Sequence, residues 1–313
     1  MRILCLGAGA IGGYFGGRLI EGGGDVEFLV REKRQKRLAA DGLRIESRFG
    51  NAHLQVKAVT GQDATGPYDL ILLTCKAYDL ANAIAAIEPF MGPGTAVLPL
   101  LNGVAHIDIL NAKFGKERVM GGVAKISATL SPEGVVKHLN DWRYVTFGEQ
   151  SGEMSPRVMA LKQAFDRTSV VASAVPNIMQ MMWEKIVHLS TVAGMTCAMR
   201  ASVGDIARTR DGTALMIELL ERNAEIARRE GYAPSESFME EYRKLFHDTA
   251  SPYMASMLRD IERGGPIEAD HIFGFLLEKA SQHGVDPLLH RFIFVHLQAY
   301  EQRRSSAPAK AAA

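Results

Sequence analysis

A glycine-rich turn near the start of the chain restricts the fold more than any other feature of the sequence. Residues 7–12 read GAGAIG, which matches the pattern G-x-G-x-x-G. An apolar run at Arg2–Leu6, expected to form a strand, precedes this turn, and apolar residues at helical spacing over Ile11–Glu21 follow it. A strand that enters a glycine turn and continues as a helix is the first unit of a β-α-β fold, so the turn predicts a parallel sheet with crossover helices.

Each of the three glycines meets a separate steric demand if the turn holds a dinucleotide. Gly7 permits the tight turn, Gly9 lets the backbone approach a pyrophosphate, and Gly12 allows close packing of the helix. The helix N-terminus adds amide groups and the positive end of its dipole. In its strand-turn-helix context the motif therefore predicts dinucleotide binding. The expected cofactor-binding residues of the loop are Gly7, Ala8, Gly9, Ala10, Ile11 and Gly12.

The rest of the first half alternates between strand-like and helix-like runs, as a doubly wound sheet requires. Its central runs are almost wholly apolar, which is typical of strands that are buried on both faces. Two later β-rich runs are expected to form antiparallel strands at the edge of the sheet. The expected strands are Asp25–Val30, Asp69–Thr74, Ala96–Leu101 and, at the edge, Val119–Leu130 and Gly134–Gly148; Leu43–Thr60 is expected to be extended, and Arg31–Ala40 and Leu80–Phe90 to be helical.

The pattern changes near residues 170–176, after which the periodic segments are helical and are separated by proline and glycine. We therefore expect an α/β fold, with an N-terminal Rossmann-like doubly wound domain at residues 1–173 and an all-α C-terminal domain at 174–303 that binds substrate. A flexible tail is expected at 304–313. The expected helices are Ile178–Arg200, Thr213–Glu230, Ser235–Phe246, Tyr253–Ile261, Ala269–His283 and Pro287–Arg303.

Composition excludes several classes of partner. At 313 residues the chain exceeds one typical core, which favours two domains. A net charge of +1 with no basic stripe argues against nucleic acid. The three cysteines, Cys5, Cys75 and Cys197, are far apart and form no CxxC pair, so neither a metal site nor a disulfide framework is expected. No run approaches the ~20 apolar residues of a membrane span, and we expect a cytoplasmic protein without a membrane partner.

The end of the second expected strand indicates which dinucleotide binds. An NAD enzyme usually places a carboxylate there, ~20 residues beyond the glycine motif, to accept hydrogen bonds from the ribose hydroxyls. Here Val30 is followed by Arg31, with Lys33 and Arg34 close behind. A guanidinium at this position suits a 2′-phosphate, so the sequence favours NADP (NADPH) over NAD. The alternative is a solvated helix start with ordinary basic residues.

Two further polar positions follow strands of the same expected sheet. Lys76 comes after the fourth strand and Asn102-Gly103 after the fifth. Ligands bind at the carboxyl edge of open α/β sheets, so a lysine and an amide at this edge would help to hold phosphate, ribose or nicotinamide. Asn102-Gly103 is also a common turn dipeptide, and that reading stays open.

Together with residues further along, these motifs resemble the ketopantoate reductases (2-dehydropantoate 2-reductases). The likeness covers essentially residues 1–300, and its motifs are specific in combination rather than singly. They are GAGAIGG at the start, Arg31 after the second strand, CKAYD around Lys76, LLNGV around Asn102, Trp183-Glu184-Lys185, Ser256-Met257 with Asp260, and Glu268-Ala269-Asp270.

The resemblance implies hydride transfer from NADPH to a 2-keto acid, in a cleft between a Rossmann domain and a helical domain. It implies that Lys185 is the proton donor and that Glu268 is an acidic residue near the cofactor ribose and the substrate. Ser256 would contact substrate, Asn102 both cofactor and substrate, and Lys76 the cofactor. A positioned ammonium would stabilise and protonate the ketone oxygen, which gains negative charge as hydride adds. The resemblance also implies a place in pantothenate biosynthesis. Apolar stripes on the last two expected helices belong either to the core or to the surface of a homodimer, and the core is favoured.

The chain departs from the family where substrate would bind. The family carries asparagines four and eight residues beyond its lysine, on one helical face, but here those positions are Leu189 and Ala193. We expect both to line a pocket that lacks two amides. In the later motif Ile267 and Phe273 replace Thr and Asn, so a more apolar substrate is favoured.

Other polar residues on the same helix are candidates to replace the missing amides. Arg200 is one candidate for gripping a carboxylate, although an arginine at that place more often caps a helix. His188 and Thr191 lie nearby at other helical angles, and their roles stay open.

Two alternatives remain beside a 2-keto acid reductase. One is a 3-hydroxy-acid-type dehydrogenase, which shares the two-domain plan and a catalytic lysine and would prefer NAD. The other is a sensor that binds NADPH without turnover, which the presence of both Lys185 and Glu268 disfavours.

Overall fold

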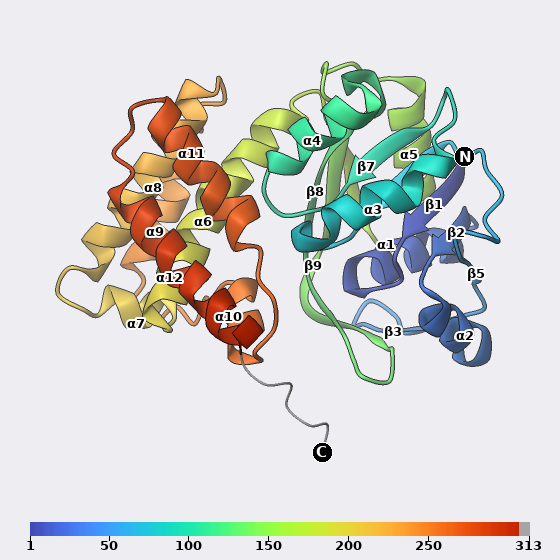
Figure 1. Cartoon of the computed structure of the whole chain (residues 1–313), viewed down its shortest axis with the longest axis horizontal. Coiled ribbons are helices and arrows are strands. Elements are labelled where there is room, and N and C mark those ends of the chain that lie inside the picture. The colour runs from blue at the N-terminus through green and yellow to red at the C-terminus, as the bar shows by residue number, and fades with distance from the viewer. Residues whose placement is uncertain (307–313) are drawn as a thin grey trace. The chain divides into compact units, whose positions relative to one another are not determined.

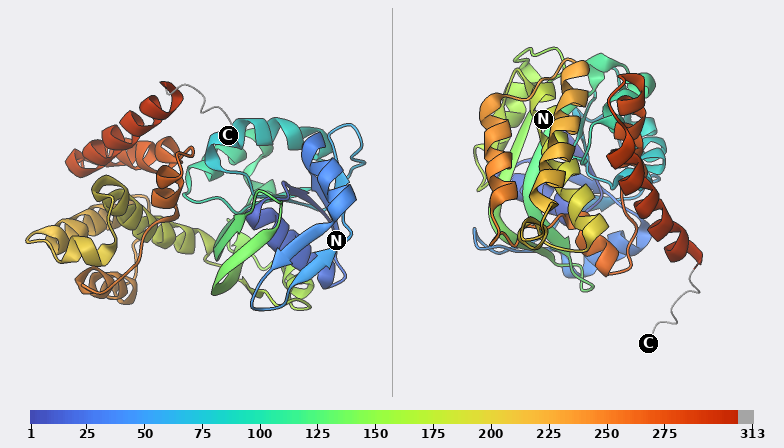
Figure 2. Two further views of the ribbon diagram at one scale, coloured as in Figure 1. Left: turned by 90° about the horizontal axis from the view of Figure 1, so that it is seen from below. Right: turned by 90° about the vertical axis from the view of Figure 1, so that its left-hand side faces the viewer.

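The computed structural model describes residues 1–306, which form two compact units (Figure 1). The first unit contains residues 1–102 and 106–179, and the second contains residues 103–105 and the chain from Gln180 onward. Sheets and helices build the first unit, whereas the described part of the second is helical, which confirms the expected fold class (Figure 2). Within residues 1–306 none of the helices combines the length and the apolar character needed to cross a lipid bilayer.

A parallel sheet with the strand order β5-β2-β1-β6-β7 lies at the centre of the first unit. Every neighbouring pair in this sheet is parallel, so all the carboxyl ends meet at one edge. The strand order reverses between β1 and β6, which is the switch point where open α/β sheets bind ligands. The strands are β1 (Arg2–Leu6), β2 (Asp25–Leu29), β5 (Lys57–Val59), β6 (Leu70–Leu73) and β7 (Ala96–Pro99).

A second five-stranded sheet holds the segments that the sequence assigned to the sheet edge. Strands β8 and β9 pair antiparallel, as expected, but they belong to this separate sheet, in the order β10-β9-β3-β4 with β8 also on β9. The edge assignment holds only at one residue, because a parallel bridge joins Val119 to Val97 in β7, the edge strand of the parallel sheet. Beyond it, β9 finds its other neighbours in strands from the Leu43–Thr60 segment and from beyond residue 170. The strands are β3 (Leu43–Glu46), β4 (Ala52–Leu54), β8 (Met120–Leu130), β9 (Val136–Glu149) and β10 (Val171–Ala174).

The first helix, α1 (Ala10–Glu21), packs between the two sheets because its glycines leave both sides bare. A Cβ at Gly16 would lie 2.8 Å from the ring of Phe28 in the parallel sheet. On the other side, a Cβ at Gly17 would lie 2.7 Å from Ile45 in the second sheet. Side chains at these positions would push the sheets apart, so the glycines that follow the turn set how closely α1 packs.

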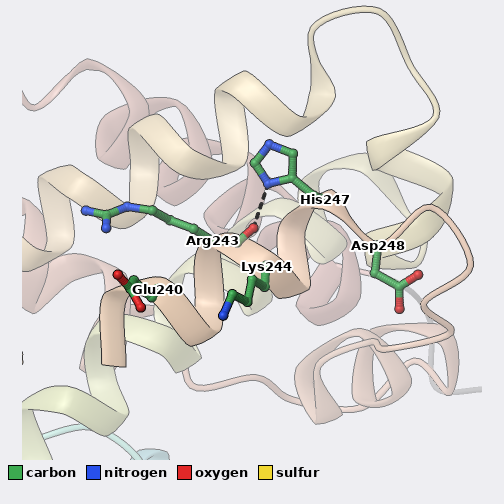
Figure 3. A pocket seen from close by; sticks show the side chains of 5 residues that line it. All are labelled: Glu240, Arg243, Lys244, His247 and Asp248. Carbon is green, nitrogen blue, oxygen red and sulfur yellow. Dashed lines mark hydrogen bonds between the residues drawn. The ribbon is translucent and has the colours of Figure 1, made fainter. Parts of the chain in front are cut away.

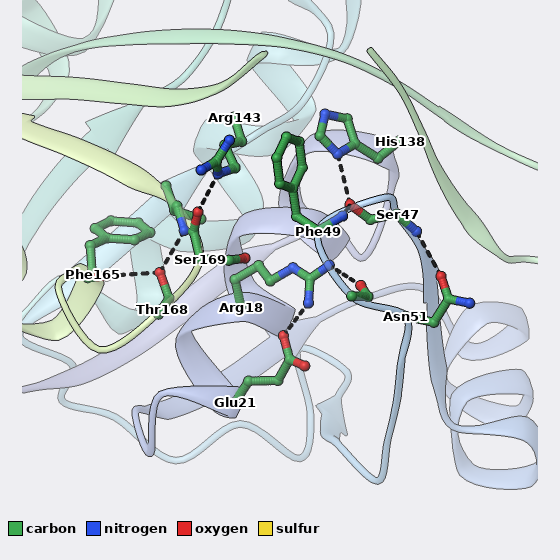
Figure 4. A network of polar contacts seen from close by, with 12 residues as sticks. Arg18, Glu21, Ser47, Phe49, Asn51, His138, Arg143, Phe165, Thr168 and Ser169 are labelled. Carbon is green, nitrogen blue, oxygen red and sulfur yellow. Dashed lines mark hydrogen bonds and ion pairs between the residues drawn. The ribbon is translucent and has the colours of Figure 1, made fainter. Parts of the chain in front are cut away.

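A polar network ties the outer part of α1 to the second sheet (Figure 4). The buried side chain of Arg18 donates to Glu21 and to the carbonyl of Gly50, each at 2.6 Å. The hydroxyl of Ser47 lies 2.9 Å from Nδ1 of His138 in β9. These bonds satisfy buried polar groups at the rim, away from the carboxyl edge of the parallel sheet.

Helices and short 3-10 turns connect the strands. Two helices of this unit were not expected from the sequence, namely α4 (Ala105–Phe114) and α5 (Pro156–Phe165). The start of helix α5 carries a common sequence signal, a serine followed by a proline. The hydroxyl of Ser155 accepts from the amide of Val158 at 3.3 Å, and Pro156 takes the first helical position. The remaining elements are α2 (Glu32–Asp41), η1 (Ala77–Asp79), α3 (Leu80–Ile87), η2 (Glu88–Phe90) and η3 (Lys116–Arg118).

The second unit packs its helices around α6 (Ile178–Met199). A Cβ at Gly194 of this helix would lie within 3.3 Å of side chains from three other helices, Leu219, Phe273 and Ile293. This close packing explains why α6 is apolar on most of its surface. The other elements are α7 (Val203–Ala207), α8 (Gly212–Arg229), α9 (Glu236–His247), α10 (Ser256–Glu262), η4 (Asp270–Gly274), α11 (Phe275–Gln282) and α12 (Leu288–Ser306).

Besides α7, which was not among the expected helices, three segments of the second unit differ from expectation. The helix expected at Tyr253–Ile261 begins only at Ser256, because the Tyr253 carbonyl instead accepts from the amide of Val203 at 2.9 Å. The segment Ala269–His283 opens with the wide π-helical turn η4 before α11. The tail expected from residue 304 begins as helix, since α12 continues to Ser306, and residues 307–313 lie outside the described part of the chain.

Candidate cofactor and catalytic sites

The glycine loop gives each of its three glycines a different environment. Gly7 has a φ of +92°, in the left-handed region that favours glycine. A Cβ at Gly12 would lie 2.2 Å from the carbonyl oxygen of Gly7 and 2.4 Å from the hydroxyl of Thr74, so protein packing excludes it. At Gly9, with an ordinary φ of −84°, no protein atom lies within 4 Å of the Cβ position. The open space at Gly9 fits a bound group rather than a packing need of the protein.

The side chains of Thr74 and Cys5 hold the loop in place. Neither residue was predicted from the sequence to belong to the site. The hydroxyl of Thr74, just after β6, donates to the carbonyl of Leu6 at 2.9 Å. The buried thiol of Cys5 donates weakly to the carbonyl of Gly12 at 3.6 Å. Burial raises the pKa of Cys5 to about 12, so this thiol stays protonated. Both groups satisfy loop carbonyls and help to fix the turn.

Basic residues surround the start of α2, where the sequence favoured a 2′-phosphate. The side chain of Arg31 is 86% exposed and lies 3.9 Å from the carboxylate of Asp79. Lys33 is also exposed. Arg34 instead turns inward and donates to the carbonyl of Ala8 in the glycine loop at 2.9 Å. The three basic residues therefore differ in how firmly the protein positions them.

Lys76 and Asn102 follow neighbouring strands of the parallel sheet. Lys76 is exposed and precedes η1 by one residue, and Asn102 is partly buried after β7. Both positions therefore lie at the carboxyl edge, as the sequence predicted for this sheet. Gly103 has a φ of +85°, and its Cβ position is 3.0 Å from Cδ2 of His271 in η4. The ring of His271 therefore packs against Gly103. Nothing in the sequence indicated this contact.

Lys185 and Glu268 interact electrostatically in the helical unit. Lys185 lies in the first half of α6, and Glu268 precedes η4 and is 7% exposed. Burial lowers the pKa of Lys185 to about 8, while the negative charge of Glu268 opposes that change. Glu184, the neighbour that could have paired with Lys185 in an ordinary surface contact, accepts from the amide of Ser235 at 3.1 Å.

The two positions that replace the family's asparagines differ in exposure. Leu189 is partly buried on α6, one helical turn beyond Lys185, whereas Ala193 is 1% exposed. Side chains at i, i+4 and i+8 share one face of a helix. Leu189 thus offers accessible apolar surface next to Lys185, and Ala193 contributes little surface of its own.

Ser256 follows a segment that contacts of Tyr253 join to α6. It is exposed at the first position of α10, and Tyr253 precedes it in the chain. The hydroxyl of Tyr253 lies 3.1 Å from Nε2 of His188, whose ring stacks on Tyr242 with centroids 4.0 Å apart. His188 is three residues beyond Lys185 on α6. His188 therefore links the segment before Ser256 to the helix that carries Lys185.

The local contacts of Arg200 and Thr191 belong to the structure of helix α6. Arg200 has a φ of +53° at the end of α6, and the next amide, that of Ala201, donates to the carbonyl of Thr196 at 3.3 Å. This is the pattern of a helix C-terminal cap. Thr191 is fully buried and donates to the carbonyl of Val187 at 2.8 Å. The described contacts thus place both residues in the helix architecture.

A surface depression in the second unit lies at other residues (Figure 3). It is lined by Glu240, Arg243, Lys244, His247 and Asp248, around the C-terminal end of α9. Nδ1 of His247 bonds to the carbonyl of Arg243 at 2.7 Å, so the histidine caps its own helix. None of these residues belongs to the expected site. Among residues 1–306 no group of three His, Cys, Asp or Glu side chains is arranged to hold a metal.

Known proteins are similar to this chain over nearly its whole length. An uncharacterized oxidoreductase of Bacillus subtilis is 34% identical and covers 97% of this chain and 100% of its own length. A crystal structure of 2-dehydropantoate 2-reductase from Methylococcus capsulatus is 25% identical, with a TM-score of 0.87 over 98% of this chain and 99% of its own. The whole chain, both units included, is therefore similar to these proteins.

Two more distant structures share the fold alone. D-mandelate dehydrogenase, solved with NADH and anilino(oxo)acetate, is 22% identical with a TM-score of 0.85 over 97% of this chain and 100% of its own. A dimeric ketopantoate reductase from Staphylococcus aureus is 19% identical, with a TM-score of 0.79 over 97% of this chain and 100% of its own.

Models of one protein family match both parts of the chain. The model described as Ketopantoate reductase PanE/ApbA matches residues 3–152, and the model of the C-terminal part of that family matches residues 177–301. The two matches span most of the sequence and follow one another in the order that the family has. The chain belongs to the ketopantoate reductase family, and it is an oxidoreductase of that family.

Proposed function

We propose that this oxidoreductase uses NADPH to reduce a 2-keto acid to a 2-hydroxy acid, and that the far end of its substrate is apolar. The observation that carries the proposal is the pair formed by Lys185 and Glu268. Burial brings the pKa of Lys185 to about 8, near neutrality, which suits a general acid. A lysine that served only for solubility would have no reason to be partly buried within reach of the charge of a carboxylate.

The glycine loop fits the proposed cofactor. Space for a pyrophosphate is open beside Gly9, where no protein atom lies within 4 Å of a Cβ position. The first turn of α1 directs its amides to the same loop. Lys76 and Asn102 at the carboxyl edge and Arg31 after β2 would hold the remaining parts of the nucleotide. When bound, NADPH supplies the hydride that adds to the carbonyl carbon of the substrate.

Lys185 would complete the reduction by proton transfer. As negative charge develops on the carbonyl oxygen, the ammonium of Lys185 stabilises it and then gives up a proton to form the hydroxyl. Glu268 favours the charged form of Lys185 and so keeps the proton available near neutral pH. Ser256, exposed at the start of α10, would contact the substrate.

The apolar surface of Leu189 supports the proposed substrate class. At this position the family carries an asparagine, which could hydrogen-bond a substrate hydroxyl. A leucine offers no such partner, and a buried hydroxyl left without one costs ~1–3 kcal/mol. We therefore propose that ketopantoate is a poor substrate and that branched or aromatic 2-keto acids are better ones.

A panel of 2-keto acids tests the proposal. NADPH oxidation would be followed by absorbance with ketopantoate, its deoxy analogue and aromatic 2-keto acids. We expect measurable turnover with kcat/KM highest for the apolar acids, and a loss of ~10²–10⁴ in kcat in Lys185→Ala. Binding of NADPH without turnover on any member of the panel would support a sensor instead.

An NADH-dependent dehydrogenase is the second candidate, because the fold neighbour D-mandelate dehydrogenase was solved with NADH. This candidate includes the 3-hydroxy-acid type of reaction. Two measurements separate it from the first: the dissociation constants of NADPH and NADH, and the rate of oxidation of 2- and 3-hydroxy acids. A tighter NADH complex together with faster oxidation of 3-hydroxy acids would favour it.

We also propose that the chain forms a homodimer through α12, as one fold neighbour is a dimeric ketopantoate reductase. Leu288, Phe292 and Val295 are 62%, 59% and 56% exposed and recur at helical spacing, so this stripe is not part of the core of the unit. Sedimentation velocity on the native chain and on Phe292→Glu tests the proposal. We expect a dimer that the charged variant weakens, and a native monomer would refute it.

A further inference from the structure

Arg34 is a partly buried arginine that joins two segments of the first unit. Its Nη2 donates to the carbonyl of Ala8 in the glycine loop at 2.9 Å. Nη1 and Nη2 also both donate to the carbonyl of Gly134, each at 3.2 Å. The turn at Gly134 packs closely against the arginine, because a Cβ at Gly134 would lie only 2.4 Å from Nη1 of Arg34. The guanidinium is therefore held in one place beside the glycine loop.

The charge of Arg34 is not neutralised by the described protein groups. Its hydrogen bonds go to neutral carbonyls, and within residues 1–306 no carboxylate forms an ion pair with it. Its Nε is buried and has no acceptor. Burial, and then the like charge of Arg37, lower the pKa of Arg34, which shows that the surroundings oppose its charge rather than stabilise it. A positive group held in this way has a strong electrostatic interaction left for an anion.

Arg31 provides the contrast. Its side chain is 86% exposed, and its nearest carboxylate, on Asp79, is at 3.9 Å. Binding a phosphate through Arg31 requires ordering a solvent-exposed side chain, and that entropy cost reduces the gain in affinity. Arg34 is already ordered, and its charge is less screened by water. Both residues follow β2, where the ribose of a dinucleotide lies in this kind of fold.

We propose that Arg34 is the fixed member of a two-arginine site for the 2′-phosphate of NADPH, with Arg31 as the solvent-exposed member. The assignment rests on the proposed function for its cofactor. Arg34 acts through its charge and through the N–H of Nη1 that remains after its bond to Gly134. It makes NADPH bind more tightly than NADH, because only NADPH carries the additional phosphate.

If Arg34 had a purely structural role, its removal would change the affinities for NADPH and NADH in a different way. If the arginine only clamps the loop at Ala8 to the turn at Gly134, its removal disturbs the pyrophosphate site, which NADPH and NADH share. Both nucleotides would then lose affinity equally. The ratio of the two dissociation constants therefore separates recognition of the 2′-phosphate from support of the loop.

The experiment measures the dissociation constants of NADPH, NADH and 2′,5′-ADP by calorimetry, in the native chain and in Arg34→Gln. We expect the affinity for NADPH and 2′,5′-ADP to fall roughly ten- to a hundredfold, the size of a lost charged hydrogen bond. The affinity for NADH should stay nearly constant. Arg44→Gln is the matched control, because Arg44 donates to the Glu133 carbonyl of the same turn at 3.4 Å and its charge is not among those that act on Arg34. It should leave the ratio unchanged.

Three outcomes overturn the assignment. An equal loss for NADPH and NADH would make Arg34 a loop clamp, and no loss at all would remove it from the site. If the native chain binds NADPH no more tightly than NADH, the proposed cofactor fails, and this inference fails with it. Should Arg34→Gln fold poorly, Arg34→Lys replaces it: a retained charge should keep most of the NADPH preference, and loss of that preference would contradict the proposal.

Discussion

Glu268 raises the pKa of the Lys185 ammonium that burial lowers, and the balance leaves this lysine at about 8. A lysine with an ordinary pKa would release its proton reluctantly, and one buried without a carboxylate would lose its proton at neutral pH. A pKa of about 8 thus suits the role of proton donor that we propose for Lys185.

Glu268→Gln should move the pH profile of the reaction. In the reductive direction the protonated lysine is the active form, so kcat/KM falls as the pH rises through about 8. Removal of the carboxylate charge lowers the pKa of Lys185 further, and the falling limb should shift to lower pH. Glu184→Gln is the control, since Glu184 is not among the groups that shift this pKa. An unmoved limb in Glu268→Gln would show that the charge of Glu268 does not act on the proton donor.

Gly9→Val should abolish NADPH binding and leave the protein folded. Outside the adjacent residues no protein atom lies within 4 Å of the Gly9 Cβ position, so the new side chain meets only the space proposed for the pyrophosphate. Gly12→Ala should instead destabilise the fold by on the order of 1–3 kcal/mol, because its Cβ would lie 2.2 Å from the Gly7 carbonyl oxygen. Thermal melts and fluorescence titrations distinguish the two. Normal NADPH binding by Gly9→Val would place the cofactor elsewhere.

Leu189→Asn should improve the reduction of ketopantoate relative to its deoxy analogue. An amide at this partly buried position restores a partner for the substrate hydroxyl, worth ~1–3 kcal/mol, or roughly five- to a hundredfold in kcat/KM. Leu189→Met, which stays apolar, is the control. A native enzyme that already prefers ketopantoate strongly would show that other groups hold the hydroxyl.

Arg200→Gly should stabilise the chain by ~0.5–1 kcal/mol. A φ of +53° is unfavourable for arginine and free of cost for glycine, and the gain exceeds the weak contact of the guanidinium with the Tyr300 ring at 5.8 Å. The melting temperature should rise by a few degrees at this chain length. An unchanged KM would agree with the capping role, whereas a large increase in KM would show that Arg200 grips the substrate carboxylate.

Acid should destabilise the helical unit through His290. Nε2 of this fully buried histidine bonds to Asn223 at 2.8 Å, Nδ1 has no partner, and burial lowers the pKa to about 4. Between pH 6.5 and 4 the unfolded chain binds a proton that the folded chain does not, so stability falls as the pH falls, by about 3 kcal/mol in total. Denaturant melts of His290→Gln, which keeps a donor for Asn223, should show a shallower pH dependence over this range. An identical pH dependence would exclude the histidine as the cause.

The sequence by itself determined the cofactor loop and the order of the elements around it. GAGAIG at residues 7–12 carries its geometry locally, because the left-handed φ of Gly7 and the missing Cβ of Gly12 are needed whatever lies further away. Apolar strands and helical periodicity likewise follow from nearby residues. For this reason the parallel sheet and the helical second half could be predicted.

Only the tertiary structure decided the partners of those elements. The pairing of β9 with strands from distant segments created a second sheet, which no local pattern specifies. The different environments of Arg31 and Arg34, three residues apart, were also decided by the tertiary structure. Arg34 donates to the carbonyls of Ala8 and Gly134, whereas Arg31 is exposed to solvent. Exposure, charge compensation and the pKa of Lys185 depend on atoms far apart in the chain, so they arise only when the chain has folded.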